Sequence, residues 1–174
     1  MKGYVVDENV AIVANDQSSG KPRAPQANTA CRLACIKKIR EIVKGRLVFI
    51  DSNGAMLNHY KKHLSRKGQT GVGDLFFKHL CDNEFNRKKI RRIDLERLDD
   101  GAYAALSIYP SLLKFDPADQ IFVAVALTAP EKPAIINAVD SDYKQFASAL
   151  LNAGVVVEEL CEDCIKTLPS KQRG

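Results

Sequence analysis

The chain has 174 residues, 45% of them hydrophobic, which is enough to bury one core but leaves no room for a second of similar size. Its 26 lysine and arginine residues outnumber its 21 aspartate and glutamate residues, giving a modest net charge of +5. The basic residues gather in three runs, at residues 37–40, 61–67 and 87–92. Such runs suit a polyanionic partner, although they are more often solvated helix faces.

No stretch approaches the roughly 20 apolar residues that span a bilayer, and the first residues acquire charge too early for a signal peptide. Five cysteines, an odd number, predict free thiols in a reducing compartment, where they serve as small buried hydrophobes. Cys161 and Cys164 form a CxxC, but Cys31 and Cys35 are separated by three residues on a predicted helix, so zinc-like spacing is not repeated. We therefore expect a soluble, cytoplasmic protein without membrane contact.

The first half of the chain alternates predicted strands with predicted helices. Short apolar runs that end on an acid predict buried strands, and apolar residues at helical spacing predict amphipathic helices. Residues 15–28, rich in polar and turn-forming types, predict a long loop that covers a groove. The strands are expected at residues 4–6 and 46–50, and the helices at 29–44, 55–64 and 74–81.

The second half is built around an apolar helix. Residues 121–127 have almost no polar face, and a helix that is hydrophobic all round must be an interior one. Pro130 and Pro133 end it, and a continuous apolar strand follows. Around it we expect a short strand at 90–95, helical turns within 98–113, a strand at 134–139, a helix at 143–153 and a strand at 155–160.

Strands alternating with helices predict the α/β class, with a mainly parallel central sheet covered by helices on both faces, a three-layer sandwich. One domain is expected over residues 1–165, followed by a polar tail at 166–174 that we expect to be disordered.

Acidic side chains follow the predicted strands directly. Asp7 ends the first strand, Asp51 the second, and Asp140 with Asp142 the strand at 134–139, while Asp119 precedes the apolar helix. In open α/β sheets ligands bind beyond the carboxyl ends of the strands, so these carboxylates are expected to converge. Converging carboxylates raise one another's pKa and normally have a cation between them. Oxygen ligands favour Mg²⁺ or Mn²⁺, which promote phosphodiester hydrolysis.

Three segments, YVVDENV, DPADQIFVAVAL and AVDSDY, the last followed by a helix and GVVVEEL, resemble the PIN-domain nucleases in order and spacing over nearly the whole chain. The resemblance implies a PIN-like sandwich with an acid cluster that binds Mg²⁺ or Mn²⁺ and cuts RNA. It assigns metal ligation and catalysis to Asp7, Asp119, Asp140 and Asp142, and matches Asn9 to a small polar residue near the first acid. Many bacterial members are toxins, so RNA, an antitoxin protein and a second copy of the chain are the expected partners.

One position departs from the family pattern. The family usually has a glutamate on the helix after the second strand, where this chain has His59. His59 is therefore a candidate metal ligand or proton donor, or the mark of a weakened site. Asp51 is a candidate replacement for the missing carboxylate, or a cap of the helix that follows it.

Three alternatives stay open. The first is a catalytically weakened PIN-like domain that serves as an RNA-binding or protein-interaction module. The second, a phosphatase of the haloacid dehalogenase type, needs an aspartate where this chain has Asn9. The third, a Ser/His/Asp hydrolase, lacks a GxSxG nucleophile elbow. The two hydrolase alternatives are disfavoured by these residues.

Overall fold

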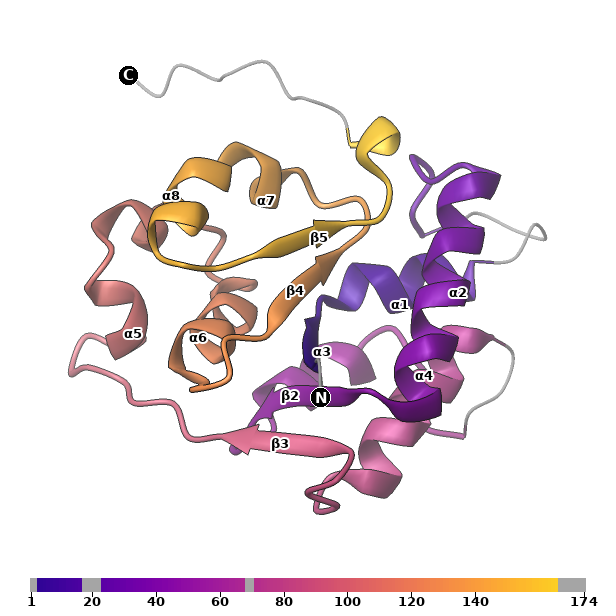
Figure 1. The fold of residues 1–174 in the computed structure, drawn as a ribbon, viewed down its shortest axis with the longest axis horizontal. Helices are drawn as coiled ribbons and strands as arrows, with labels where there is room; N and C mark the ends of the chain where they lie inside the picture. Colours follow the sequence, from indigo (N-terminus) through magenta and orange to yellow (C-terminus); the bar gives the residue numbers. More distant parts are fainter. Residues whose placement is uncertain (1–2, 17–22, 68–70, 166–174) are drawn as a thin grey trace.

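A computed structural model describes residues 3–16, 23–67 and 71–165. Its centre is a five-stranded, all-parallel sheet in the order β3-β2-β1-β4-β5, which confirms the predicted α/β class (Figure 1). The strands are β1 (Gly3–Val6), β2 (Leu47–Asp51), β3 (Ile90–Ile93), β4 (Ala134–Asn137) and β5 (Val157–Glu159).

Helices cover both faces of the sheet. Those before β3 are α1 (Glu8–Asn15), α2 (Thr29–Gly45), α3 (Ala55–Lys61) and α4 (Val72–Asn83). Those after it are α5 (Ala104–Ser107), α6 (Gln120–Thr128), α7 (Ser141–Gln145) and α8 (Ala147–Asn152), with 3-10 turns η1 (Pro110–Lys114) and η2 (Glu162–Cys164). Helices α1, α2 and α4 pack together, whereas α6 packs against β1, β2 and β4 (Figure 1). This is the three-layer sandwich predicted from the sequence.

Helix α6 is the interior helix of the fold. Every residue from Ile121 to Leu127 is buried, as its all-round hydrophobicity predicts. The short strands β1, β2 and β4 are buried almost throughout, which is typical of parallel strands covered on both faces. Because α6 crosses three strands, its first residues lie near the edge where those strands end.

The strand order reverses direction between β1 and β4. The chain runs from β1 to β2 and β3 on one side of the sheet, and from β4 to β5 on the other. The two strands are neighbours in the sheet, with Tyr4 paired to Ala134 and Val6 to Ile136. The loops that leave them diverge, and this is where open parallel sheets form a ligand crevice.

The helix expected over residues 143–153 is two short helices, α7 and α8. Phe146 separates them, with non-helical backbone angles of φ −98° and ψ 14°. Its ring packs against Phe115, with 5.3 Å between the ring centroids. This tertiary contact explains the break, because amphipathic spacing alone favours one continuous helix.

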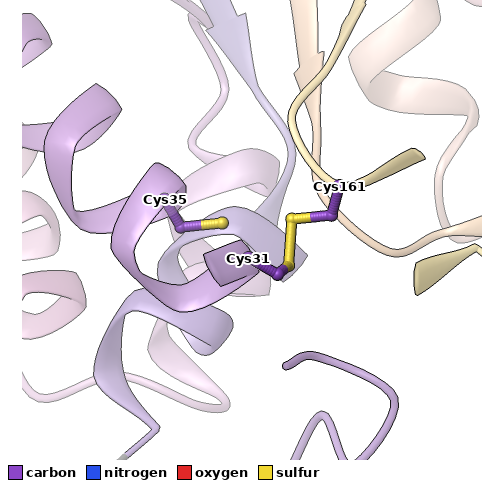
Figure 2. Close-up of side chains that lie close together, drawn as sticks. All are labelled: Cys31, Cys35 and Cys161. Atoms are coloured by element: carbon purple, nitrogen blue, oxygen red, sulfur yellow. A yellow bond between two sulfur atoms is a disulfide. The ribbon is translucent and has the colours of Figure 1, made fainter. Parts of the chain in front are cut away.

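The expectation that all cysteines are free thiols is wrong for one pair. Cys31, in the first turn of α2, is disulfide-bonded to Cys161, 130 residues later (Figure 2). The start of α2 lies against the turn after β5, so the two Cα atoms are 5.1 Å apart, within the usual range for a disulfide. Cys35, Cys81 and Cys164 are free.

Two further expectations lie wholly or partly outside the described residues. The polar tail at 166–174 lies outside them, as does the middle of the loop at 15–28. Within the described ranges, none of the helices has the length and apolar character needed to cross a bilayer.

Candidate metal centre

Three of the predicted acids meet at the carboxyl edge of the sheet. Asp7, Asp119 and Asp140 each offer one carboxylate oxygen, and these oxygens all lie within 4.8 Å of one another. Asp7 follows β1, Asp140 follows β4, and Asp119 precedes α6. The group thus lies at the reversal of strand order, and its members come from three separate parts of the chain.

The local structure leaves Asp119 the least engaged of the three. Asp7 caps α1, where its Oδ1 accepts from the Asn9 backbone N–H at 2.9 Å. Asp140 caps α7 in the same way, accepting from the Asp142 N–H at 2.9 Å. Asp119 occupies the cap position of α6 but makes no side-chain cap hydrogen bond. Its carboxylate is therefore directed to the acid cluster rather than to its own helix.

An asparagine clasp joins the ends of β1 and β4. The Asn9 amide donates to Asp7 Oδ1 at 2.6 Å and to Asn137 Oδ1 at 2.9 Å. Its own Oδ1 accepts from the backbone N–H groups of Ala138, at 2.9 Å, and Val139, at 3.3 Å. The fully buried Asn137 in turn donates to the Asp140 carbonyl at 2.8 Å. The clasp fixes Asp7 relative to Asp140.

Tyr143, one turn into α7, completes the support of the buried Asp7. Its hydroxyl donates to Asp7 Oδ2 at 2.7 Å, and its side chain is buried. Both Asp7 oxygens thus accept hydrogen bonds, yet a carboxylate has lone pairs left for a cation. Sequence reasoning did not single out Tyr143 for this role, since only the fold brings residues 7 and 143 together.

The electrostatics of the cluster favour a cation. Burial, followed by the charges of Asp119 and Asp140, raises the pKa of Asp7 well above its ordinary value. Burial, followed by Asp140 and other nearby carboxylates, raises the pKa of Asp119 to about 7. Burial raises the pKa of Asp140 too. Without a cation the group holds protons that ordinary aspartates would have lost, and a bound cation would replace them.

His59 lies beside this cluster and contacts Glu8. The ring Nδ1 is 3.8 Å from Glu8 Oε2, and the ring meets Phe122 edge-on at 5.9 Å. Burial and then Lys62 lower the pKa of His59, which favours the neutral ring. His59 is not among the three residues whose carboxylate oxygens converge.

Glu8 is a site residue that sequence reasoning missed. Its Oε2 is buried without a hydrogen-bond partner, and its charge contributes to the raised pKa of Asp119. Burial raises the pKa of Glu8 itself. The signal available was its place directly after Asp7, at the first position of a helix that starts at the carboxyl edge.

The remaining predicted acids have different surroundings. Asp142 contributes to the raised pKa values of Asp119 and Asp140 but is not one of the three converging carboxylates. Asp51 accepts from the backbone N–H groups of Asn53, Ala55 and Met56, at 2.8 to 3.1 Å, so it caps α3. This is the second of the two roles considered for Asp51.

The three converging residues fit a small, hard divalent cation. All three ligands are carboxylate oxygens, the donor type that Mg²⁺ and Mn²⁺ prefer. Oxygens about 2.1 Å from an octahedral ion lie roughly 3 to 4 Å from one another, within the spread seen here. The Glu8 Oε2 atom, which accepts no hydrogen bond, adds an acceptor beside the cluster.

Comparison with known proteins identifies no relative: no family model, curated protein or solved structure matches the chain. The geometry of the site is therefore the main basis for inferring a function.

Proposed function

We propose that the protein is a metal-dependent endoribonuclease that hydrolyses RNA phosphodiester bonds with Mg²⁺ or Mn²⁺. The observation that carries the proposal is the convergence of Asp7, Asp119 and Asp140 at the strand-order reversal. The resemblance of the sequence to the PIN-domain nucleases supports RNA as the substrate.

In this proposal Asp7, Asp119 and Asp140 hold the ion. Bound there, it would stabilise negative charge on a phosphate and make water more acidic. The chain's own contribution is positioning: Asn9 and Tyr143 fix the Asp7 carboxylate, and the Asp142 N–H fixes that of Asp140. Asp142 and Glu8 add negative charge around the ion.

Of the three basic runs, the one at residues 61–67 best suits the phosphate backbone of the substrate. Lys62 is exposed, and its charge lowers the pKa of Glu8, which places it near the acid cluster. The other two runs are partly neutralised within the fold. Lys38 pairs with Glu158 at 2.6 Å, and Arg91 pairs with Glu131 at 3.3 Å.

The test is cleavage of mixed-sequence single-stranded RNA with Mg²⁺, with Mn²⁺ or with chelator, using the parent and two variants. We expect the parent to cut only with metal and Asp119→Asn to lose on the order of 100-fold or more in rate. Asp100→Asn is the matched control: Asp100 is exposed and accepts from the Ala102 N–H at 2.9 Å, a bond that asparagine can keep. Equal cutting by the parent and Asp119→Asn would reject the proposal.

The second candidate is a catalytically weakened domain that binds RNA or a protein, and the observation that favours it is His59. The family's glutamate is replaced there by a ring that contacts Glu8. His59→Glu distinguishes the two candidates. A weakened site should gain metal-dependent cutting from the restored carboxylate, whereas an enzyme that uses Glu8 and His59 should lose it. A toxin role, with an antitoxin partner or homodimer, belongs to the first candidate and follows from the resemblance alone.

A further inference from the structure

A second candidate metal site lies apart from the acid cluster, and its potential ligands are cysteine sulfur atoms. Cys31 and Cys35 are one turn apart on α2 and so share a helix face. Cys161 directly precedes η2 and Cys164 is its last residue, and the Cys164 N–H donates to the Cys161 carbonyl at 2.8 Å. The sulfur atoms of Cys31, Cys35 and Cys161 all lie within 4.8 Å of one another, and Figure 2 shows the Cys35 side chain pointing toward the other two.

The fourth cysteine belongs to the same neighbourhood. Cys164 is not one of the three cysteines whose sulfurs lie within 4.8 Å of one another, but its backbone N–H is bonded to the Cys161 carbonyl at 2.8 Å, which places it beside them. Burial and then the Cys164 thiol raise the pKa of Cys35 to about 12. All four side chains are buried, at 0 to 8% exposure. The fifth cysteine, Cys81, lies on α4 and is partly exposed. The two cysteine pairs that appear unrelated in the sequence therefore meet in the fold.

The contact between α2 and the end of β5 does not depend on the disulfide alone. Lys38, on the next turns of α2, forms an ion pair with Glu158 of β5 at 2.6 Å. The Lys38 ammonium also lies over the Tyr4 ring, 4.3 Å from its centroid. Because this partly buried ion pair holds the two segments together, the four cysteines are expected to stay close after reduction of the disulfide.

We propose that the reduced protein binds one Zn²⁺ through Cys31, Cys35 and Cys161, with Cys164 as the fourth ligand. Zinc–sulfur bonds of about 2.3 Å in a tetrahedron place the sulfurs about 3.8 Å apart. The Cys35 sulfur lies within 4.8 Å of the two disulfide-bonded sulfurs, and reduction of the disulfide frees Cys31 and Cys161 to separate to this spacing. A closed set of four thiolates is typical of structural rather than catalytic zinc. In the reduced chain the ion would join the start of α2 to the turn after β5. In the oxidised chain the disulfide makes this connection.

The disulfide and the metal are alternative states of the same sulfurs. A phosphine reductant and one water convert the disulfide to two thiols and the phosphine to its oxide. Four thiols then bind Zn²⁺ with release of four protons. A disulfide oxidant would reverse this reaction. It would take two electrons from Cys31 and Cys161, which form their disulfide again, and would itself become two thiols. Loss of these two ligands would expel the ion.

Cobalt titration of the full chain tests the proposal. After reduction with phosphine under anaerobic conditions and removal of metals, Co²⁺ should bind with one equivalent giving intense thiolate charge-transfer absorption, and Zn²⁺ should displace it. Cys35→Ser and Cys164→Ser should each weaken Zn²⁺ binding at least tenfold. Cys81→Ser is the matched control and should bind as the parent does. Absence of the thiolate bands in the reduced parent, or equal effects of Cys35→Ser and Cys81→Ser, would overturn the proposal.

A measurement on the parent alone covers the case in which a variant fails to fold. In native mass spectrometry the reduced parent should carry one more Zn²⁺ than the disulfide-bonded parent, with four protons lost for that ion; an equal Zn²⁺ load in the two forms overturns the proposal. Asp119→Asn should keep the thiolate bands, because oxygen ligands produce none, so this site and the acid cluster are tested separately.

Discussion

The Tyr143 hydroxyl donates to Asp7 Oδ2 at 2.7 Å, and both side chains are buried. This hydrogen bond favours the ionised form of Asp7 against the burial that raises its pKa. The bond joins Asp7, which follows the central strand β1, to α7, which starts more than 130 positions later. The protonation of Asp7 therefore depends on the placement of α7.

Tyr143→Phe is predicted to weaken Mn²⁺ binding by about 10-fold to 100-fold, the usual effect of removing a group that orients a metal ligand. The ring remains, so its edge contact with Phe115, at 5.1 Å, is kept and the fold should persist. Calorimetric titration with Mn²⁺ measures the loss. Tyr103→Phe is the control, because the Tyr103 hydroxyl accepts from Arg97 instead. Unchanged Mn²⁺ affinity in Tyr143→Phe would contradict this role for the hydroxyl.

The stability of the metal-free protein should fall as pH rises through the acid cluster. The pKa of Asp119 is raised from its ordinary value of 3.8 to about 7, so between these values the folded chain holds a proton that the unfolded chain has lost. Its contribution to stability is therefore present below about pH 4 and lost by pH 8. After allowance for solvent screening, the loss is about 1 to 2 kcal/mol.

Mg²⁺ or Mn²⁺ should reverse that loss, and the thermal unfolding midpoint measures it. At pH 8 the ion should raise the midpoint, whereas at pH 5 protons compete with it and the effect should be small. Asp119→Asn should be more stable than the parent at pH 8 without metal and should gain less from it. A midpoint equally raised by metal at both pH values would contradict the coupling.

Removal of the asparagine clasp should affect stability and activity together. Asn9→Ala deletes two hydrogen bonds to carboxyl-edge side chains and leaves the Ala138 N–H without its partner. The expected cost is about 1 to 3 kcal/mol in the free energy of unfolding. Urea unfolding measures it, with exposed Asn58→Ala as the control. Metal-dependent cleavage should fall as well, since Asp7 loses its alignment; full activity would show that the clasp is only structural.

The sequence predicts the three converging carboxylates of this site better than it predicts the residues that support them. Buried strands that end on acids predict Asp7 and Asp140 at one edge, and the apolar helix predicts the placement of Asp119. The role of Tyr143 was not predictable, because it depends on which strands are neighbours, whereas Glu8 could have been found from its place directly after Asp7. The Cys31–Cys161 bond was missed for the same reason: its two residues are 130 positions apart, and their spacing gives no sign of contact.

RNA binding should depend on Lys62 more than on lysines at the opposite edge of the sheet. Lys62→Ala is predicted to weaken binding of single-stranded RNA to the inactive Asp119→Asn protein and to reduce the salt dependence of affinity by about one unit of slope. Lys44→Ala is the matched control, because Lys44 is exposed in the last turn of α2, just before β2 begins. Equal losses in both variants would mean that binding follows net charge alone.

The central position of β1 also governs when the site exists. β1 pairs with β4, whose residues follow about 130 positions later, and Asp7 meets Asp140 only after that pairing. A chain still on the ribosome therefore carries its first acid without the others. The complete acid cluster should therefore be confined to chains whose translation has passed α7.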